Sequence, residues 1–167
     1  MSDSRITAEA AELLYREALH LDRQAWDAWL ALYLPDAEFW VPAWKGEHQP
    51  TENPDRELSL FYYSSRRGLE ERVIRVRSGK SVTTLPLPRT AHLVGNVIVE
   101  PMKTPEAIAA FSTWTVHLYH PKDHKQTVLF GRYEHHLRRT GDGWAIARKK
   151  VILLNDRIPT LLDFYCL

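Results

Sequence analysis

One stretch of the sequence has the residue types and spacing of a metal site. His117, His120 and His124 form the pattern H-x-x-H-x-x-x-H, and Asp123 lies beside the last of them. On a helix, residues three and four apart share one face and could bind one ion together. The alternation over 113–119 is typical of a strand, where positions 117 and 120 point to opposite faces. We therefore expect no metal site here and interpret these histidines as solvated or interface residues.

Three further residues are candidates for general acid–base catalysis, which needs a histidine or carboxylate in an apolar pocket that retunes its pKa. Asp22, Asp36 and His92 are the best placed, since each borders a predicted element. Helix capping and turn formation explain Asp22 and Asp36 equally well. Both interpretations stay open at this point. The neighbours His135 and His136 point to opposite faces of a strand and are interpreted as solvated or interface residues.

The motifs of common cofactor sites are missing from the sequence. Its seven glycines form no G-x-G-x-x-G or Walker pattern for a nucleotide. An iron–sulfur cluster or a paired C-x-x-C zinc site needs several thiolates, and Cys166 is the one cysteine. We expect no cofactor and no metal in this chain. A single cysteine also allows no internal disulfide, which fits a cytoplasmic protein.

Length and charge limit the class of protein. At 167 residues the chain is predicted to form one domain over 1–167. A domain of this size can bury a hydrophobic core that needs no disulfide or metal ion for its stability. Its 22 Lys and Arg against 21 Asp and Glu give a net charge of +1, which argues against nucleic-acid binding. No apolar stretch reaches the length of a membrane span. The six Trp, seven Tyr and five Phe are an unusually large aromatic content for one small domain.

The first third of the sequence is predicted to be helical. A first helix begins after Thr7 as N-cap and has Leu14, Ala18 and Leu21 on its apolar face. Asp22 could cap a second helix, which Pro35 ends. The apolar stripe of that helix is Trp26, Trp29, Leu30 and Tyr33.

The middle of the chain is predicted to mix a strand with short helices. Residues 38–44 alternate as a strand. Asp55 could cap a short helix that carries Leu58, Phe61 and Tyr62, and Gly68 would break it. A further turn or two of helix follows, although residues 73–76 could equally be strand.

From residue 91 onward the pattern predicts long antiparallel strands. In the first of them Leu93, Val97 and Val99 alternate with His92, Asn96 and Glu100. Later strands bury Trp114, Val116 and Leu118, and then Tyr133 and Leu137. Residues 141–143 (Gly-Asp-Gly) predict a hairpin turn. Helices followed by antiparallel strands predict an α+β fold, in which a strongly curved, mostly antiparallel sheet wraps over N-terminal helices as a cone.

Two basic residues stand in an otherwise apolar strand. Lys149 and Lys150 directly precede Val-Ile-Leu-Leu at 151–154. A buried lysine needs an opposite charge. We therefore expect a buried partner charge, which could lie on another subunit.

At this point the residues match a family. The carrying segments are D-x-x-x-W-D-A-W-L-x-L-Y (22–33), FWVPAW (39–44), NPDRELSLFYY (53–63), GLEERV (68–73), PRTAH (88–92) with Asn96, and RKKV (148–151) with Asn155-Asp156. From about residue 10 to its end, the sequence resembles the small (β) subunits of aromatic ring-hydroxylating dioxygenases. The details are most similar to the benzoate and anthranilate type.

The resemblance implies a cystatin-like or nuclear-transport-factor-2-like (NTF2-like) cone. It also implies a hexamer of three large (α) and three small subunits that cis-dihydroxylates a benzoate- or anthranilate-like acid. In that family the large subunit carries the Rieske [2Fe-2S] cluster and the mononuclear iron. Electrons come from NADH through a separate reductase. The small subunit holds the large subunits in a ring, so no catalytic, cofactor-binding or metal residue carries over to this chain.

The aromatic surplus fits such an assembly, because large obligate interfaces favour Trp, Tyr and Arg. Core packing is the alternative role for each of these rings. The predicted subunit contacts are Trp40, Trp44, Tyr62, Tyr63, Arg66, Arg72, Lys149 and Lys150.

A second function stays open from sequence alone. The chain could be a stand-alone isomerase or dehydratase of the SnoaL/NTF2-like type that uses an Asp or His in its pocket. An open cavity with a buried acid would favour that enzyme. Bulky side chains filling the cone would favour the subunit.

Overall fold

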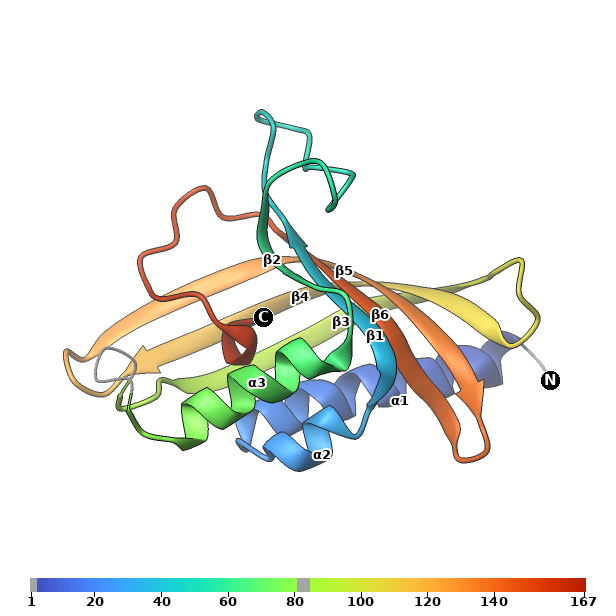
Figure 1. Ribbon diagram of the computed structural model, residues 1–167, viewed down its shortest axis with the longest axis horizontal. Helices are drawn as coiled ribbons and strands as arrows, with labels where there is room; N and C mark the ends of the chain where they lie inside the picture. The colour runs from blue at the N-terminus through green and yellow to red at the C-terminus, as the bar shows by residue number, and fades with distance from the viewer. Residues whose placement is uncertain (1–2, 81–84) are drawn as a thin grey trace.

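The computed structural model describes residues 3–80 and 85–167, which form one curved six-stranded sheet with helices along one side (Figure 1). The strand order is β2-β1-β6-β5-β4-β3. The elements in chain order are α1 (Asp3–Asp22), α2 (Trp26–Leu30), β1 (Tyr33–Pro42), β2 (Ser59–Tyr63), α3 (Arg66–Arg77), β3 (Arg89–Pro101), β4 (Ala107–His120), β5 (Lys125–Thr140), β6 (Gly143–Leu153) and the 3-10 turn η1 (Phe164–Cys166).

The pairing confirms the mostly antiparallel α+β cone. β3, β4, β5 and β6 form an antiparallel meander, and β2 pairs antiparallel with β1. The exception is β1, which runs parallel to β6, with Phe39 opposite Lys149. Among the helices of the described ranges, none is both long and apolar enough to cross a membrane.

Helix α1 begins earlier than the sequence predicts. It starts at Asp3 rather than after Thr7. An ion pair one turn apart, Arg5 Nε to Glu9 Oε1 at 3.0 Å, stabilises the added turn. The predicted apolar face is confirmed, because Leu14, Ala18 and Leu21 are buried.

Helix α2 is shorter than its apolar stripe suggests. It ends at Leu30, and Tyr33 is already the first residue of β1. Strand pairing decides this boundary, since the Ile146 N–H donates to the Leu32 carbonyl at 2.8 Å. Asp22 does not cap α2; the N-cap position is Ala25, which has no side-chain hydrogen bond there. Burial of Trp26 and Trp29 agrees with the stripe.

The predicted short helix over 55–62 is wrong. Residues 59–63 are the edge strand β2, with Tyr62 opposite Trp40 of β1. Gly68 does not break a helix either, because it lies inside α3. A Cβ at Gly68 would meet the Tyr63 ring at 2.4 Å, so glycine lets α3 pack directly on β2.

The predicted faces of β3 are wrong at its N-terminal half because the strand contains a bulge. Asn96 has a φ of 54°, and the register with β4 shifts between Gly95 and Ile98. A bulge shifts which residues point to each face. His92 therefore points inward with a buried side chain, while Leu93 points outward and is 58% exposed.

The predicted faces of β4 and β5 are confirmed, and so is the hairpin between β5 and β6. Trp114, Val116 and Leu118 are buried on the inward face of β4, as are Tyr133 and Leu137 on β5. The hairpin pairs Thr140 with Gly143, whose φ of 126° suits glycine.

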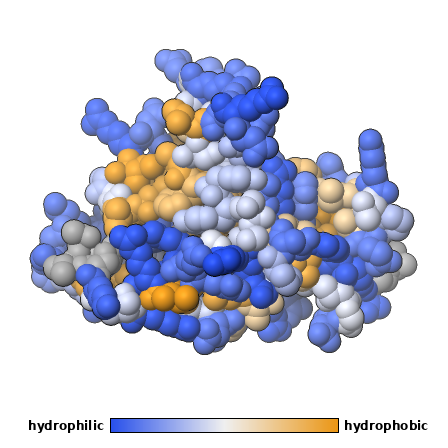
Figure 2. All heavy atoms as spheres, in the orientation of Figure 1, coloured by the Kyte–Doolittle hydropathy of each residue, from blue (hydrophilic) through white to orange (hydrophobic). Residues whose placement is uncertain are grey.

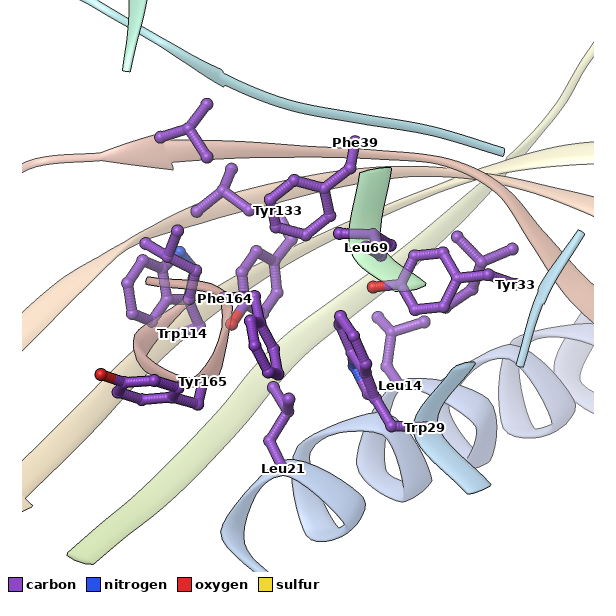
Figure 3. Close-up of a cluster of buried hydrophobic side chains, with 14 of the residues drawn as sticks. Leu14, Leu21, Trp29, Tyr33, Phe39, Leu69, Trp114, Tyr133, Phe164 and Tyr165 are labelled. Carbon is purple, nitrogen blue, oxygen red and sulfur yellow. The ribbon is translucent and has the colours of Figure 1, made fainter. Parts of the chain in front are cut away.

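Aromatic rings fill the interior of the cone (Figure 3). Trp29 stacks on Phe164 with ring centroids 4.9 Å apart, and Trp114 stacks on Tyr133 at 5.1 Å. The inward faces of the strands, the helices and the segment around η1 all contribute to this one cluster of buried side chains.

Candidate functional site

Two of the three acid–base candidates form a pair. His92 Nδ1 lies 2.6 Å from Asp22 Oδ1, at the junction of α1 and β3. The same carboxylate accepts hydrogen bonds from the Thr90 hydroxyl and the His92 main-chain N–H, both at 2.9 Å. Asp22 therefore joins the end of α1 to β3, and the other ring nitrogen of His92, Nε2, is buried without a hydrogen-bond partner among the residues that the structure describes.

The third candidate, Asp36, lies elsewhere. Its carboxylate accepts from Arg138 Nη2 at 2.8 and 2.9 Å, and both side chains are largely exposed. Arg138 lowers the pKa of Asp36. An exposed ion pair of this kind has a surface role, so Asp36 does not belong to an interior site.

The histidine pattern at 117–124 is not brought together. His117 Nδ1 lies 3.5 Å from the Gln126 side-chain nitrogen, His120 contacts the Thr127 hydroxyl at 3.3 Å, and His124 contacts the Tyr119 hydroxyl at 2.8 Å. Across residues 3–80 and 85–167 there is no group of three or more His, Cys, Asp or Glu side chains positioned to hold a metal ion.

A buried charged cluster at the centre of the cone was missed by the sequence analysis. Glu17 Oε1 accepts hydrogen bonds from Lys149 Nζ at 2.8 Å, from the Trp29 indole at 3.2 Å and from the Tyr33 hydroxyl. Its other oxygen lies 3.6 Å from His135 Nε2. The expected partner of Lys149 is therefore in the same chain, and His135 is fully buried rather than solvated.

In this cluster, opposite charges and hydrogen bonds offset the cost of burying the charged groups. Burial alone would raise the pKa of Glu17, but the charge of Lys149 and the contact with His135 outweigh it and lower that pKa. Burial also lowers the pKa of His135, against the opposing pull of Glu17. The glutamate is thus ionised and the histidine neutral at pH 7. The missed signal was Glu17 itself, which follows Leu14 by three positions on the apolar face of α1.

The eight predicted contact residues differ in burial. Trp40 and Lys149 are buried within the chain, and the Trp40 indole donates to Ser59 Oγ at 2.9 Å. The remaining six are half-buried: Trp44, Tyr62, Tyr63, Arg66, Arg72 and Lys150.

Most of the half-buried six have partners inside the chain. The Trp44 indole donates to the Leu153 carbonyl at 2.8 Å, and Arg66 donates to the Tyr33 carbonyl at 2.8 Å. Arg72 forms a two-pronged ion pair with Asp163. These bonds fix the orientation of side chains around β2 and α3 and leave parts of each at the surface. Their contact with other subunits stays a prediction.

The outward face of the sheet carries a set of exposed apolar residues that the sequence analysis did not single out. Three of them, Leu93, Phe130 and Leu154, line an open groove of about 610 Å³ on this face. We call the set the outer apolar band; it consists of Leu93, Ile98, Phe111, Val128, Phe130 and Leu154. Figure 2 shows one face of the molecule, which is mostly hydrophilic, with apolar residues gathered above α3. Such patches commonly mark interaction surfaces.

Comparison with known proteins defines the class. The family model for the ring hydroxylating beta subunit matches residues 16–160. The chain belongs to this family. It is the small subunit of an aromatic ring-hydroxylating dioxygenase, and so part of an oxidoreductase system.

Individual relatives agree with that assignment. The chain is 39% identical over 155 residues to the anthranilate 1,2-dioxygenase small subunit of Acinetobacter baylyi, covering 93% of each chain. It is 38% identical over 157 residues to the benzoate 1,2-dioxygenase subunit beta of the same organism, covering 94% of this chain and 91% of the relative. These relatives favour the subunit over a stand-alone isomerase or dehydratase.

Solved structures agree on the fold. The beta subunit of benzoate 1,2-dioxygenase from Burkholderia mallei has a TM-score of 0.78 at 35% identity and covers 96% of both chains. A cystatin-like protein from Nostoc punctiforme, at 14% identity and covering 91% of this chain and 92% of its own, has a TM-score of 0.58 and shows the fold alone. The predicted cystatin-like or NTF2-like cone is confirmed.

Proposed function

We propose that this chain is a non-catalytic subunit that holds dioxygenase large subunits in a ring of three large and three small subunits. The observation that carries the proposal is the contrast between the two faces of the sheet. The inward face is covered by the chain's own rings and helices, whereas the outward face exposes the outer apolar band. A surface of this kind stabilises a hetero-oligomer by burial of apolar area.

The proposed cofactors lie in the partner. The large subunit supplies the Rieske cluster, the mononuclear iron and the substrate pocket, and a reductase supplies electrons from NADH. Support comes from the relatives, which are small subunits of anthranilate and benzoate 1,2-dioxygenases. The proposed substrate is a benzoate- or anthranilate-like aromatic acid, and the proposed compartment is the cytoplasm.

Two surfaces of the chain are proposed to contact other subunits. One is the outer apolar band. The other is formed by the six half-buried residues near β2 and α3, where the Tyr62 hydroxyl donates to Glu38 at 3.1 Å and the Tyr63 ring packs against Gly68 of α3. Aromatic and arginine side chains that are already held in place lose little entropy when a partner binds.

Co-expression tests the proposal. The chain is produced together with the large subunit of a benzoate or anthranilate dioxygenase and analysed by size-exclusion chromatography with light scattering. We expect a stable complex that, with a reductase and NADH, oxidises the aromatic acid. A small subunit that never joins the large one, yet converts a substrate by itself, would contradict the proposal.

A further inference from the structure

Residues 163–167 run into the interior of the cone, where all five are buried. Figure 1 shows η1, the middle of this segment, beside α3 on the side of the sheet that the helices cover. The segment fills space that the inward faces of the strands and the helices would otherwise enclose. Its contacts show what kind of group that space accepts.

The first contact is made by the Phe164 ring with two tryptophan rings. The Phe164 ring stacks on Trp29 at 4.9 Å between centroids and 23° between planes. Trp26 meets the same ring edge-on at 5.1 Å and 76°. Both indoles come from α2, so this short helix forms a ready-made binding surface for one aromatic ring.

The second contact is an oxygen acceptor on a buried lysine. Lys149 Nζ donates to the main-chain oxygen of Leu167 at 3.2 Å and to Glu17 at 2.8 Å. The ammonium group also lies 4.3 Å from the centroid of the Tyr133 ring. Lys149 therefore offers a donor to whatever oxygen occupies the position of Leu167.

The walls of the interior also hold polar atoms without a protein partner. Within the described part of the chain, His92 Nε2, Ser112 Oγ and Trp114 Nε1 are buried and make no hydrogen bond. They lie on the inward faces of β3 and β4. Buried polar groups are nearly always satisfied, and exceptions point to a water or a ligand group.

An ion pair fixes the start of the segment 163–167. Arg72 on α3 forms the two-pronged ion pair with Asp163, whose side chain is 3% exposed while that of Arg72 is 24% exposed. The pair lies directly before the Phe164 ring. Loss of Arg72 would leave Asp163 as a buried unpaired charge and would favour release of the segment.

We propose that the interior of the cone is a binding site for an aromatic ring that carries an oxygen acceptor, and that residues 163–167 occupy it as an internal ligand. The ring takes the place of Phe164 on Trp29, and the oxygen takes the place of the Leu167 main-chain oxygen on Lys149. The unpartnered His92 Nε2 forms a hydrogen bond with a polar group of the ligand. This binding site goes beyond assembly with a large subunit and does not depend on it.

The chain contains its own reporter for this exchange. Cys166 is the one cysteine in the sequence and lies within the segment, fully buried. Burial raises the pKa of its thiol to about 12, so the thiol is unreactive while the segment is in place. The rate of Cys166 labelling by Ellman's reagent therefore measures the population of the state in which residues 163–167 lie outside the interior of the cone.

The experiment uses the full chain, unaltered and with Arg72→Gln, and the probe 3-phenylpropanamide. Two control compounds each lack one feature: ethylbenzene lacks the oxygen, and propanamide lacks the ring. We expect Arg72→Gln to raise the labelling rate by at least about tenfold, because it shifts the population toward the open state. The control Arg67→Gln, on the same helix but in an exposed ion pair, should not change the rate.

The probe should raise the Cys166 rate further and with saturation in Arg72→Gln, and at higher concentration in the unaltered chain. Both control compounds should have clearly smaller effects. A probe that leaves the rate unchanged in both chains would overturn the proposal, and so would a control compound that acts as strongly as the probe. If Arg72→Gln does not fold, the same comparison in the unaltered chain decides. Assembly with the large subunit is measured separately, so failure here is distinguishable from failure of the proposed function.

Discussion

Glu17 of α1 and Lys149 of β6 form a fully buried ion pair, with 2.8 Å between Oε1 and Nζ. The pair connects the first helix to the last strand through the middle of the cone. Two further donors, Trp29 and Tyr33, satisfy the same carboxylate. An ion pair that is completed by other hydrogen bonds can be kept in a core without a large net cost.

Removal of one partner of this ion pair should strongly destabilise the fold. Lys149→Met leaves Glu17 ionised and buried without its cation, which should lower the free energy of unfolding by about 3–5 kcal/mol. Urea denaturation measures this change. The double variant Glu17→Gln/Lys149→Met should recover most of the loss. Lys125→Met removes an exposed ion pair and should change the free energy by less than about 1 kcal/mol. Equal effects of the two lysine variants would contradict the assignment.

The sequence predicts the general architecture well because periodic patterns report which face of an element is buried. The faces of β4 and β5 and the Gly-Asp-Gly hairpin follow from residue types alone. Elements whose secondary structure depends on residues far away in the sequence cannot be predicted in this way. The residues of β2 are predicted as helix because a local pattern does not reveal their pairing with β1. The bulge at Asn96 reverses the faces of β3.

The interior site was predictable only in part. Asp22 and His92 were both candidates, yet nothing in the sequence showed that they meet, because 70 residues separate them. A buried partner charge for Lys149 was expected, but its position in the same chain was not. A glutamate on an apolar helix face and a lysine in an apolar strand are each unusual, and the structure shows that they explain one another.

Acid should weaken the fold through His135. Burial lowers the pKa of this histidine below its ordinary value of 6.5, so the unfolded chain binds the proton more readily. The contribution of His135 to the free energy of unfolding therefore declines as the pH falls below about 6.5. Urea denaturation at pH 7.5 and pH 5.5 should show a smaller decline for His135→Gln than for the unaltered chain. His48→Gln, at an exposed position, should behave as the unaltered chain does. An identical pH dependence in His135→Gln would show that His135 is not the group responsible.

A methyl group at Gly68 should disturb the packing of α3 on β2. Alanine is the better helix former by about 1 kcal/mol, but its Cβ would lie 2.4 Å from the Tyr63 ring. We expect Gly68→Ala to lower the free energy of unfolding by about 1–3 kcal/mol, as overpacking does. Gly46→Ala is the control, because a Cβ there has no neighbour within 4 Å. Thermal unfolding of both variants checks the prediction, and a more stable Gly68→Ala chain would refute the close contact.

A charge in the outer apolar band should prevent assembly without unfolding the chain. Phe130 is 46% exposed on β5, so Phe130→Asp should change the stability of the isolated chain by no more than about 1 kcal/mol. Co-purification with the large subunit should be lost. Leu19→Asp, on the exposed side of α1, should assemble normally. Normal assembly of Phe130→Asp would remove the outer apolar band from the proposed interface.

The most direct test of the non-catalytic role is native mass spectrometry of the co-expressed complex combined with iron analysis of its separated subunits. We predict a complex of three large and three small chains in which all iron remains with the large subunit. Oxidation of the aromatic acid should require the large subunit. Iron bound to this chain alone, or oxidation of the acid in the absence of the large subunit, would contradict the account.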